Sequence, residues 1–179
     1  MFCKRPVVGP RPNVVIDLDM DEILVRDARP EDLAVIVAQN QALAVESEAM
    51  GLEADVLTRG VAAALAEPDR LRYWVAEVTG KVVGQTAVSR EWSDWRNGWL
   101  WWLQSVFVAP EHRGRGVFRA LHAHVRKTAL AQADVVGLRL YVEESNFAAQ
   151  RTYLQLGMDH GGYHVYEEIW PRRAGDWPE

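Results

Sequence analysis

The stretch VFVAPEHRGRGVFRAL, residues 106–121, contains the turn that decides the fold. The apolar run 106–108 predicts the end of a strand, and Pro110 ends it because proline has no backbone N–H to give to a sheet. Apolar residues then recur at helical spacing, which predicts a helix over about 116–132. A glycine-rich loop therefore joins a strand to the N-terminus of a helix.

This loop has the chemistry of an anion site. A helix N-terminus offers unpaired backbone N–H groups and a partial positive charge. Gly114 and Gly116 put no Cβ in front of those groups, and Arg113 and Arg115 add charge-assisted hydrogen bonds. We therefore expect a cradle for a phosphate group. A solvated arginine turn is the plainer alternative, because one Gly-x-Gly is a weak signal. The Walker A and dinucleotide-binding patterns are both incomplete here.

The rest of the chain predicts a mixed α/β domain with one layer of sheet covered by helices. Its order is β-αα-βββ-α-β-α-β, with an extended arm before it and a tail after it. Besides the elements above, the expected segments are a strand at 22–28, helices at 28–50 and 54–68, a hairpin at 72–92 around Thr79-Gly80, a strand at 99–110 after the turn Asn97-Gly98, a strand at 135–144, a helix at 146–157, a strand at 163–170, an arm at 1–22 and a tail at 171–179.

Length and composition narrow the class of protein. A chain of 179 residues, 49% hydrophobic, suits one compact domain. No apolar run reaches the roughly 20 residues that span a bilayer, and the first 20 residues do not make a convincing signal peptide. The lone Cys3 fits a reducing compartment, so we expect a cytoplasmic protein without membrane contact. The net charge of -5 argues against nucleic acid as a partner, although Arg119, Arg126 and Lys127 continue the basic loop along the helix.

Two blocks of the sequence carry a resemblance to a known family. Residues 106–121 resemble the acetyl-CoA pyrophosphate loop of the GNAT N-acetyltransferases, whose pattern is Arg/Gln-x-x-Gly-x-Gly/Ala. Arg113 and Gly116 match, whereas Phe118 stands where the family usually has Gly or Ala. The block LYVEESNFAAQRTYLQLGM, residues 140–158, resembles the family's second signature through Asn146, Ala149, Tyr153, Gly157 and Met158. The resemblance covers about residues 23–170. The segment EWSDWRNG…WWLQSVFV is similar to the corresponding segment of one bacterial subgroup of the GNAT family.

The resemblance implies both a fold and an activity. The fold is a single GNAT-like domain at 23–170, with a mostly antiparallel mixed sheet splayed between its fourth and fifth strands and helices on both faces. The activity is transfer of an acetyl group from acetyl-CoA to a primary amine by direct attack in a ternary complex, without a metal. The implied cofactor-binding residues are Val106, Phe107, Val108, Arg113, Gly114, Arg115, Gly116, Val117, Phe118, Asn146 and Tyr153.

Within that set the resemblance implies separate roles. The strand ending at Val108 would pair its backbone with the pantetheine amides, and an N–H near Val106 would hold the acetyl oxygen. Asn146 would lie near the pantetheine arm. Tyr153, the expected catalytic residue, would protonate the leaving thiolate. The plainer interpretation of Asn146 and Tyr153 is a helix N-cap and a core tyrosine.

The general base stays open at this point. An amine with a pKa of about 10.4 must lose a proton before it attacks. Some GNAT enzymes use a Glu on the fourth strand, but Gln104 stands at the comparable position and cannot act as a base. The candidates are water and four acidic residues that also fit ordinary surface charges, namely Glu46, Glu48, Glu91 and Asp94.

The acceptor also stays open, as a small molecule or a peptide. Trp99 and Trp101 point to one face of their strand and Trp102 to the other, most simply as core and hairpin packing. An aromatic wall for the acceptor, or the patch of a homodimer, is the alternative. If the tryptophans met the acidic segment 46–53, the pocket would suit a cation with an apolar body. A CoA-binding sensor domain without turnover is the competing function, and Gln104 and Phe118 favour it.

Overall fold

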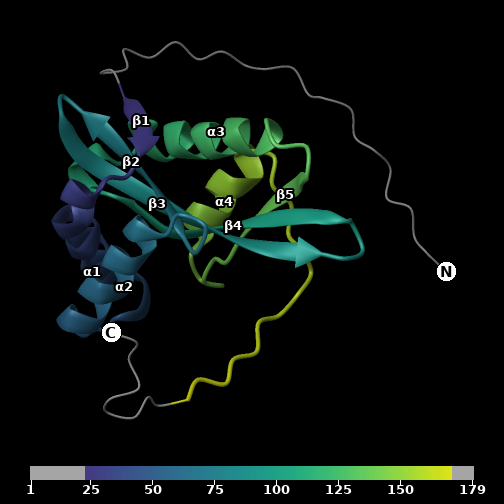
Figure 1. Cartoon of the computed structure of the whole chain (residues 1–179), viewed down its shortest axis with the longest axis horizontal. Helices are drawn as coiled ribbons and strands as arrows, with labels where there is room; N and C mark the ends of the chain where they lie inside the picture. Colours follow the sequence, from purple (N-terminus) through teal and green to yellow (C-terminus); the bar gives the residue numbers. More distant parts are fainter. Residues whose placement is uncertain (1–22, 171–179) are drawn as a thin grey trace. The chain divides into compact units, whose positions relative to one another are not determined.

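The computed structural model describes residues 23–170 in two compact units, of which the first ends at Tyr141 and the second begins at Val142. Figure 1 follows the chain through its elements. The expected arm at 1–22 and tail at 171–179 lie outside the described residues.

The first unit is built on a five-stranded sheet in the order β1-β2-β3-β4-β5. The first three pairings are antiparallel and the β4–β5 pairing is parallel, so the predicted mixed, mostly antiparallel sheet is confirmed. The strands are β1 (Leu24–Asp27), β2 (Arg72–Val78), β3 (Lys81–Ser93), β4 (Gly98–Val108) and β5 (Val135–Leu140).

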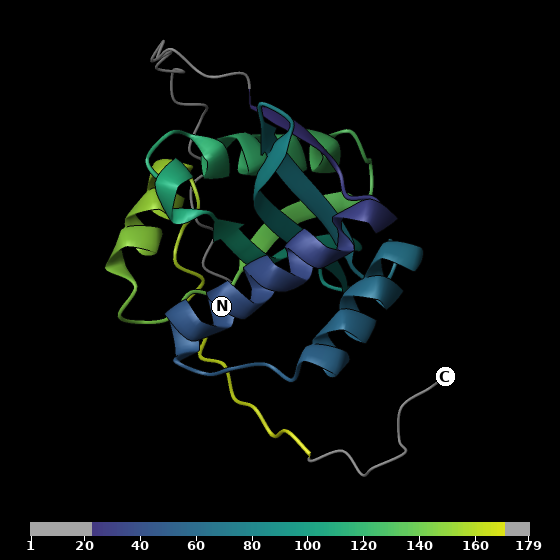
Figure 2. The same cartoon turned by 90° about the vertical axis from the view of Figure 1, so that its left-hand side faces the viewer.

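Helices cover both faces of this sheet, as expected (Figure 1). On one face a short 3-10 turn η1 (Pro30–Asp32) leads into α1 (Leu33–Glu48), which packs on β3 and β4, and α2 (Ala54–Ala66) packs on β2. Figure 2 shows α1 and α2 side by side on that face. On the other face α3 (Val117–Leu130) crosses all five strands and buries Val117, Leu121 and Val125 against them.

Two tight turns connect the three central strands. Thr79 and Gly80 both have positive φ, 49° and 77°, which is the geometry of the two-residue turn that matches the twist of a hairpin. Asn97, with φ 48°, closes the turn before β4, and Gly98 starts that strand. Both turns were predicted from their Thr-Gly and Asn-Gly pairs.

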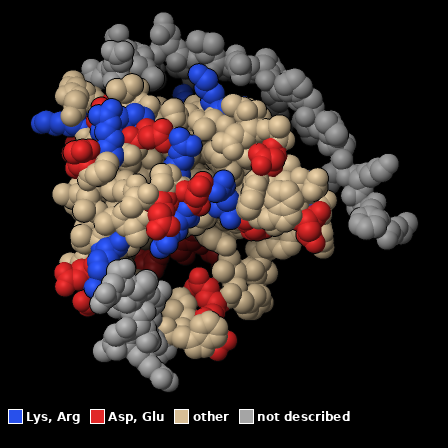
Figure 3. All heavy atoms as spheres, viewed as in Figure 1, with Lys and Arg blue, Asp and Glu red and all other residues tan. Residues whose placement is uncertain are grey.

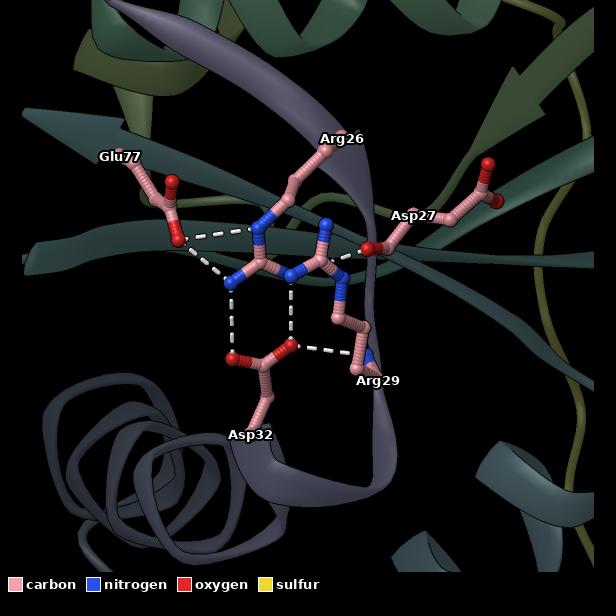
Figure 4. A network of polar contacts seen from close by, with 5 residues as sticks. All are labelled: Arg26, Asp27, Arg29, Asp32 and Glu77. Atoms are coloured by element: carbon pink, nitrogen blue, oxygen red, sulfur yellow. Dashed lines mark hydrogen bonds and ion pairs between the residues drawn. The ribbon is translucent and has the colours of Figure 1, made fainter. Parts of the chain in front are cut away.

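A network of charges fastens β1 to its neighbours (Figure 4). The Arg26 guanidinium donates to both carboxylate oxygens of Asp32 in η1 and to Glu77 in β2. Asp32 also accepts the backbone N–H of Arg29 at 2.7 Å. Hydrogen bonds from Arg26 lower the pKa of Asp32, so this carboxylate stays charged to lower pH than a free aspartate. The network fixes where α1 begins.

Buried amides fix α1 further along its length. Asn40 accepts a hydrogen bond from Gln85 Nε2 at 2.7 Å, and its own Nδ2 donates to the Tyr73 hydroxyl at 3.2 Å. Asn40 and Gln85 are 7% and 0% exposed, so the geometry of this contact is not shared with solvent. Because each buried amide needs its partner, the network sets the register of α1 against β2 and β3.

The second unit contains α4 (Phe147–Gln155). Asn146 caps it by accepting the Ala149 N–H at 3.1 Å, and Gly157, with φ 85°, follows its last turn. This helix was predicted, with Asn146 as its N-cap and Gly157 at its end.

Two predictions about strands were wrong. Residues 163–170 form no strand, and the predicted strand 135–144 ends at Leu140. A strand requires a neighbour for its N–H and C=O groups, whereas β-forming side chains alone do not create one. The large apolar side chains of 163–170 are instead mostly exposed, from 57% to 92%, at Tyr163, Val165, Tyr166, Ile169 and Trp170.

Candidate active site

The sheet opens between β4 and β5. Their parallel pairing runs from Trp99–Val135 to Leu103–Leu140 and then stops, while β4 continues to Val108. Among the described residues, no strand pairs with 104–108 on the side away from β3. The predicted splay between the fourth and fifth strands is therefore confirmed. It leaves a row of backbone groups available to an extended ligand.

A β-bulge lies at the start of this unpaired segment. Ala87 pairs with Gln104 and Gln85 with Phe107, so β4 uses one residue more than β3 over the same length. Ser105 takes up the difference with φ 50°, a left-handed conformation that is uncommon outside glycine. A bulge bends its strand and leaves one residue outside the ladder. Strained residues of this kind cost about 1–3 kcal/mol and cluster at functional sites.

The glycine loop follows β4 as the sequence predicted. A 3-10 turn η2 (Pro110–His112) leads into residues 113–116, where Gly114 and Gly116 have φ 73° and 86°. Gly116 is the N-cap of α3 and supplies no side chain to its first N–H groups. A Cβ added at Gly114 would meet nothing within 4 Å, so the space in front of the loop is open. The loop geometry fits an anion at the helix N-terminus.

Arg113 joins three parts of the first unit. Its Nε donates to the Val108 carbonyl at 2.8 Å, at the end of β4. Its Nη2 donates to Glu46 Oε2 at 2.7 Å, near the end of α1. Its guanidinium carbon also lies 5.7 Å from the centre of the Phe107 ring. The arginine is thus held beside the loop by contacts that the sequence did not predict.

The two predicted residues of the second unit lie on α4 and at its cap. Asn146 is engaged as the N-cap, which is the plainer role expected for it. Tyr153 is half-buried, and burial raises the pKa of its hydroxyl above the usual value near 10. Its hydroxyl is therefore protonated at neutral pH. Seven residues, about two helical turns, separate the two side chains, so they share one side of α4.

The carboxylates considered as bases have different surroundings. Glu91 accepts the Trp102 indole N–H at 2.6 Å and an Arg139 N–H at 3.2 Å. Asp94 accepts the backbone N–H of Trp95 at 2.9 Å within the β3–β4 turn. Glu46 pairs with Arg113. Glu91 and Asp94 therefore have structural partners, and Glu46 is tied to the residue expected to bind phosphate.

An aromatic cluster lies on β4 and the end of β5, on the face that carries α1 and α2 elsewhere. Trp102 stacks on Tyr141 with ring centres 4.4 Å apart, and the Arg139 guanidinium lies 5.4 Å from the Trp102 ring centre. Trp101 is buried in the core on the α3 side. Within the described residues, the hydrogen-bonding and ring partners of Trp102 are thus Glu91, Arg139 and Tyr141, not the acidic segment 46–53.

Sequence reasoning missed Arg139 and Tyr141. They alternate with Leu138 and Leu140, which pack against the core, so the two-residue period placed both on the other face. The sequence alone could not predict the register of β5 against β4, which sets Arg139 opposite Trp102. Gln104, which the sequence excluded as a base, donates its Nε2 hydrogen bond to Ser89 Oγ at 2.5 Å.

Residues 23–170 contain neither a cluster of metal ligands nor a helix that could span a membrane. In that part of the chain no three His, Cys, Asp or Glu residues are grouped as metal ligands. None of its helices is both long and apolar enough to cross a membrane. Figure 3 shows acidic and basic side chains interspersed on the face in view, in keeping with a modest net charge of -5.

Comparisons with known proteins agree with the fold. The model of the acetyltransferase (GNAT) family matches residues 38–158, more than half of the chain. The chain therefore belongs to the GNAT acetyltransferase family, as its two motifs implied. Members of this family use acetyl-CoA as the acetyl donor, and they act on small-molecule or peptide acceptors.

Particular relatives are similar over different lengths. A possible acetyltransferase from Clostridium difficile 630, known from its crystal structure, is 41% identical and superposes with a TM-score of 0.77 over 84% of this chain and 99% of that one. A predicted acetyltransferase of Clostridium acetobutylicum, crystallised with acetyl-CoA, is 16% identical over 82% of this chain and 96% of its own, with a TM-score of 0.68, and shows the fold alone.

A curated relative is similar over a shorter region. Streptothricin acetyltransferase of Escherichia coli is 26% identical over 91 residues, which are 51% of this chain and 49% of that protein. The chain thus matches about half the length of this curated relative.

Proposed function

We propose that the protein is an acetyl-CoA-dependent N-acetyltransferase that moves an acetyl group to a primary amine by direct attack in a ternary complex. The observation that carries the proposal is the unpaired, bulged end of β4, which leads within a few residues into the glycine loop at the N-terminus of α3. An extended pantetheine arm and a pyrophosphate require these two features in this order.

The cofactor-binding residues divide by the part of CoA that each would hold. Arg113, Arg115 and the backbone of 114–118 would bind the pyrophosphate. The backbone of 106–108 would hydrogen-bond to the pantetheine amides, and Asn146 would lie near the same arm. When bound, acetyl-CoA supplies the acetyl group as a thioester. The open space at Gly114 and the uncapped helix N-terminus support this fit.

The chain's own residues would then act on the two ends of the breaking bond. The N–H near Val106, released from the ladder at the bulge, would donate to the acetyl oxygen. The amine nitrogen forms the new C–N bond while the C–S bond breaks, and the Tyr153 hydroxyl would give its proton to the departing sulfur. The amine arrives as an ammonium ion and would lose two protons. One goes to water or to a carboxylate before the attack, and the other, lost after the C–N bond forms, returns through water to Tyr153.

The acceptor is proposed only as an amine. Similarity to an enzyme named for streptothricin supports a small molecule, and the open cluster of Trp102 and Tyr141 offers apolar surface for its body. The base is not assigned by the surroundings of Glu91 and Asp94, because both have structural partners.

The test begins with cofactor binding to the full chain. Arg113→Ala combined with Gly116→Val removes one guanidinium from the loop and places a Cβ where an anion would approach. We expect CoA affinity, measured by calorimetry, to fall at least about tenfold, since hydrogen bonds to charged groups contribute about 1.5–3 kcal/mol. Arg126→Ala, an exposed arginine near the end of α3, is the charge-matched control. Unchanged CoA affinity in the folded double variant would remove the pyrophosphate from this loop.

Turnover separates the enzyme from the competing function, a CoA-binding sensor. Gln104, held by Ser89 where a carboxylate would be needed, favours the sensor. The protein is incubated with acetyl-CoA and a panel of amines, and both free thiol and product mass are followed. Release of thiol together with an acetylated amine supports the enzyme, whereas tight CoA binding without either product supports the sensor.

A further inference from the structure

The contact between Arg113 and Glu46 links the cofactor loop to α1. The two residues are 67 positions apart, their side chains are 47% and 42% exposed, and the N–O distance is 2.7 Å. Glu46 is held in place from behind, because the buried Asn40–Gln85 contact fixes the register of α1. The packing of α1 on the sheet therefore places the Glu46 carboxylate beside the glycine loop.

Glu46 differs from the neighbouring acids in what its partner does. Glu91 accepts hydrogen bonds from Trp102 and Arg139, and neither of them is needed by CoA in the proposed function. Glu46 depends on Arg113, the residue that the pyrophosphate would also attract. A diphosphate carries more negative charge than one carboxylate, so it competes for the same guanidinium at an advantage.

The position of Glu46 suits the acceptor as well. A single guanidinium joins the Glu46 carboxylate to the Val108 carbonyl, so the carboxylate lies within the span of one arginine head from the end of β4. That end belongs to the unpaired segment 104–108, along which the proposed function puts the pantetheine arm, with the acetyl group near Val106. A primary amine arriving there near neutral pH is a cation and lacks a counter-ion.

We propose that Glu46 binds the ammonium group of the acceptor, and that Arg113 masks it until CoA is bound. This inference rests on the proposed function. In the free protein Arg113 pairs with Glu46, and in the CoA complex Arg113 turns to the pyrophosphate and releases the carboxylate. The amine then takes the place of Arg113 as the cation beside Glu46. The acceptor is accordingly a cationic amine, and it binds after acetyl-CoA.

The first arm of the test measures CoA binding. Glu46→Gln removes the competitor for Arg113, so CoA should bind about two- to fivefold more tightly, the range expected of a half-exposed ion pair. Glu111→Gln, an exposed acid in η2 two residues from Arg113, reports the general effect of one fewer negative charge near the loop. In an Arg113→Gln background, the gain from Glu46→Gln should shrink to the gain from Glu111→Gln.

The second arm measures the amine. Propylamine, benzylamine and 1,3-diaminopropane are offered with saturating acetyl-CoA, and thiol release is followed. For any of them that the wild type acetylates, Glu46→Gln should raise KM about fivefold or more while kcat changes less. Glu111→Gln should leave that KM unchanged. The opposite signs, tighter CoA and weaker amine, distinguish an exchange of partners from a loss of fold.

The outcomes separate this inference from the proposed function. If the wild type binds CoA and acetylates an amine, but Glu46→Gln matches Glu111→Gln in both arms, the inference is wrong and the enzyme stands. If CoA affinity rises and the amine KM does not, the acceptor role of Glu46 is overturned. If the wild type acetylates none of the amines, the acceptor role fails together with the proposed enzyme. Should Glu46→Gln unfold, Glu46→Ala and Glu46→Asp repeat the comparison.

Discussion

The proposed proton donor, the Tyr153 hydroxyl, can be tested by removing a single oxygen atom. Tyr153→Phe keeps the ring of a half-buried side chain on α4 and removes only its hydroxyl. Burial raises the pKa of Tyr153 above its usual value near 10. At pH 7.5 fewer than about one in 300 molecules therefore carries the phenolate, so nearly all the wild type is ready to donate.

The expected loss follows from what replaces the hydroxyl. Without Tyr153 the leaving thiolate must take its proton from water, so kcat should fall by roughly 10²-fold, the low end of general-acid contributions. That factor corresponds to about 2.7 kcal/mol of transition-state stabilisation. The unfolding free energy should change by no more than about 1 kcal/mol, the net contribution of a hydrogen bond. CoA affinity should stay the same, because the bond to sulfur strengthens only as the C–S bond breaks.

Steady-state rates from pH 6 to 10 provide the assay, with Tyr166→Phe as control. Tyr166 is 92% exposed in the same unit, and its variant should match the wild type. Since the raised pKa keeps Tyr153 protonated, the wild-type rate should show no alkaline decline below about pH 10 from this residue. A Tyr153→Phe enzyme with wild-type kcat would refute the role. A decline near pH 8 that the substitution abolishes would refute the protonation state.

Two further predictions concern stability. Asp32→Asn should lower the unfolding free energy at pH 7 by about 1–3 kcal/mol, because Arg26 loses an ionised partner. The folded pKa of Asp32 is depressed, so its contribution is present above the unfolded value near 3.9 and is lost as pH falls through the folded value. Urea titrations at pH 7 and pH 3 should therefore show the gap between the two proteins shrinking, and an equal gap at both would contradict the linkage. Gly98→Ala should cost about 1–3 kcal/mol, since its Cβ would lie 2.5 Å from Val136 Cγ1 and 2.7 Å from the Asp134 carbonyl oxygen. The control in thermal unfolding is Gly60→Ala in α2, whose Cβ meets nothing within 4 Å. Equal melting temperatures of the Gly98→Ala and Gly60→Ala variants would show that the residues at the β4–β5 junction move aside at little cost in stability.

Local signals predicted most of the fold. The Thr79-Gly80 and Asn97-Gly98 pairs marked turns because left-handed backbone at such positions is set by one or two residues. The glycine loop and α3 were predicted for the same reason, as the strand end, the helix start and the glycines all lie within 106–121. Asn146 marked the start of α4 through its own side chain.

Contacts between residues far apart in the chain could not be predicted from the sequence. The Arg113–Glu46 and Arg139–Glu91 contacts join residues 67 and 48 positions apart, and only the packing of α1 and the register of β5 bring them together. The bulge was equally hidden, because Ser105 is not a residue type that favours positive φ. The strand expected at 163–170 failed for the converse reason: its side chains favour a strand, but no partner strand is present for it within 23–170.

The departure from the family pattern at Phe118 is explained by where the helix begins. Gly114 and Gly116 carry the left-handed backbone, and α3 starts at Val117, so residue 118 is already helical and does not require glycine. The Phe118 ring lies along the helix, with its centre 6.1 Å from that of His122 one turn later. Burial lowers the pKa of His122, which is therefore neutral near pH 7 and adds no charge beneath the ring. Positive potential at the loop must then come from the arginines and the helix N-terminus. Replacing Phe118 would leave that potential unchanged. Replacing Arg113 would lower it and would also remove the hydrogen bond to Val108 at the end of β4 and the ion pair with Glu46 near the end of α1.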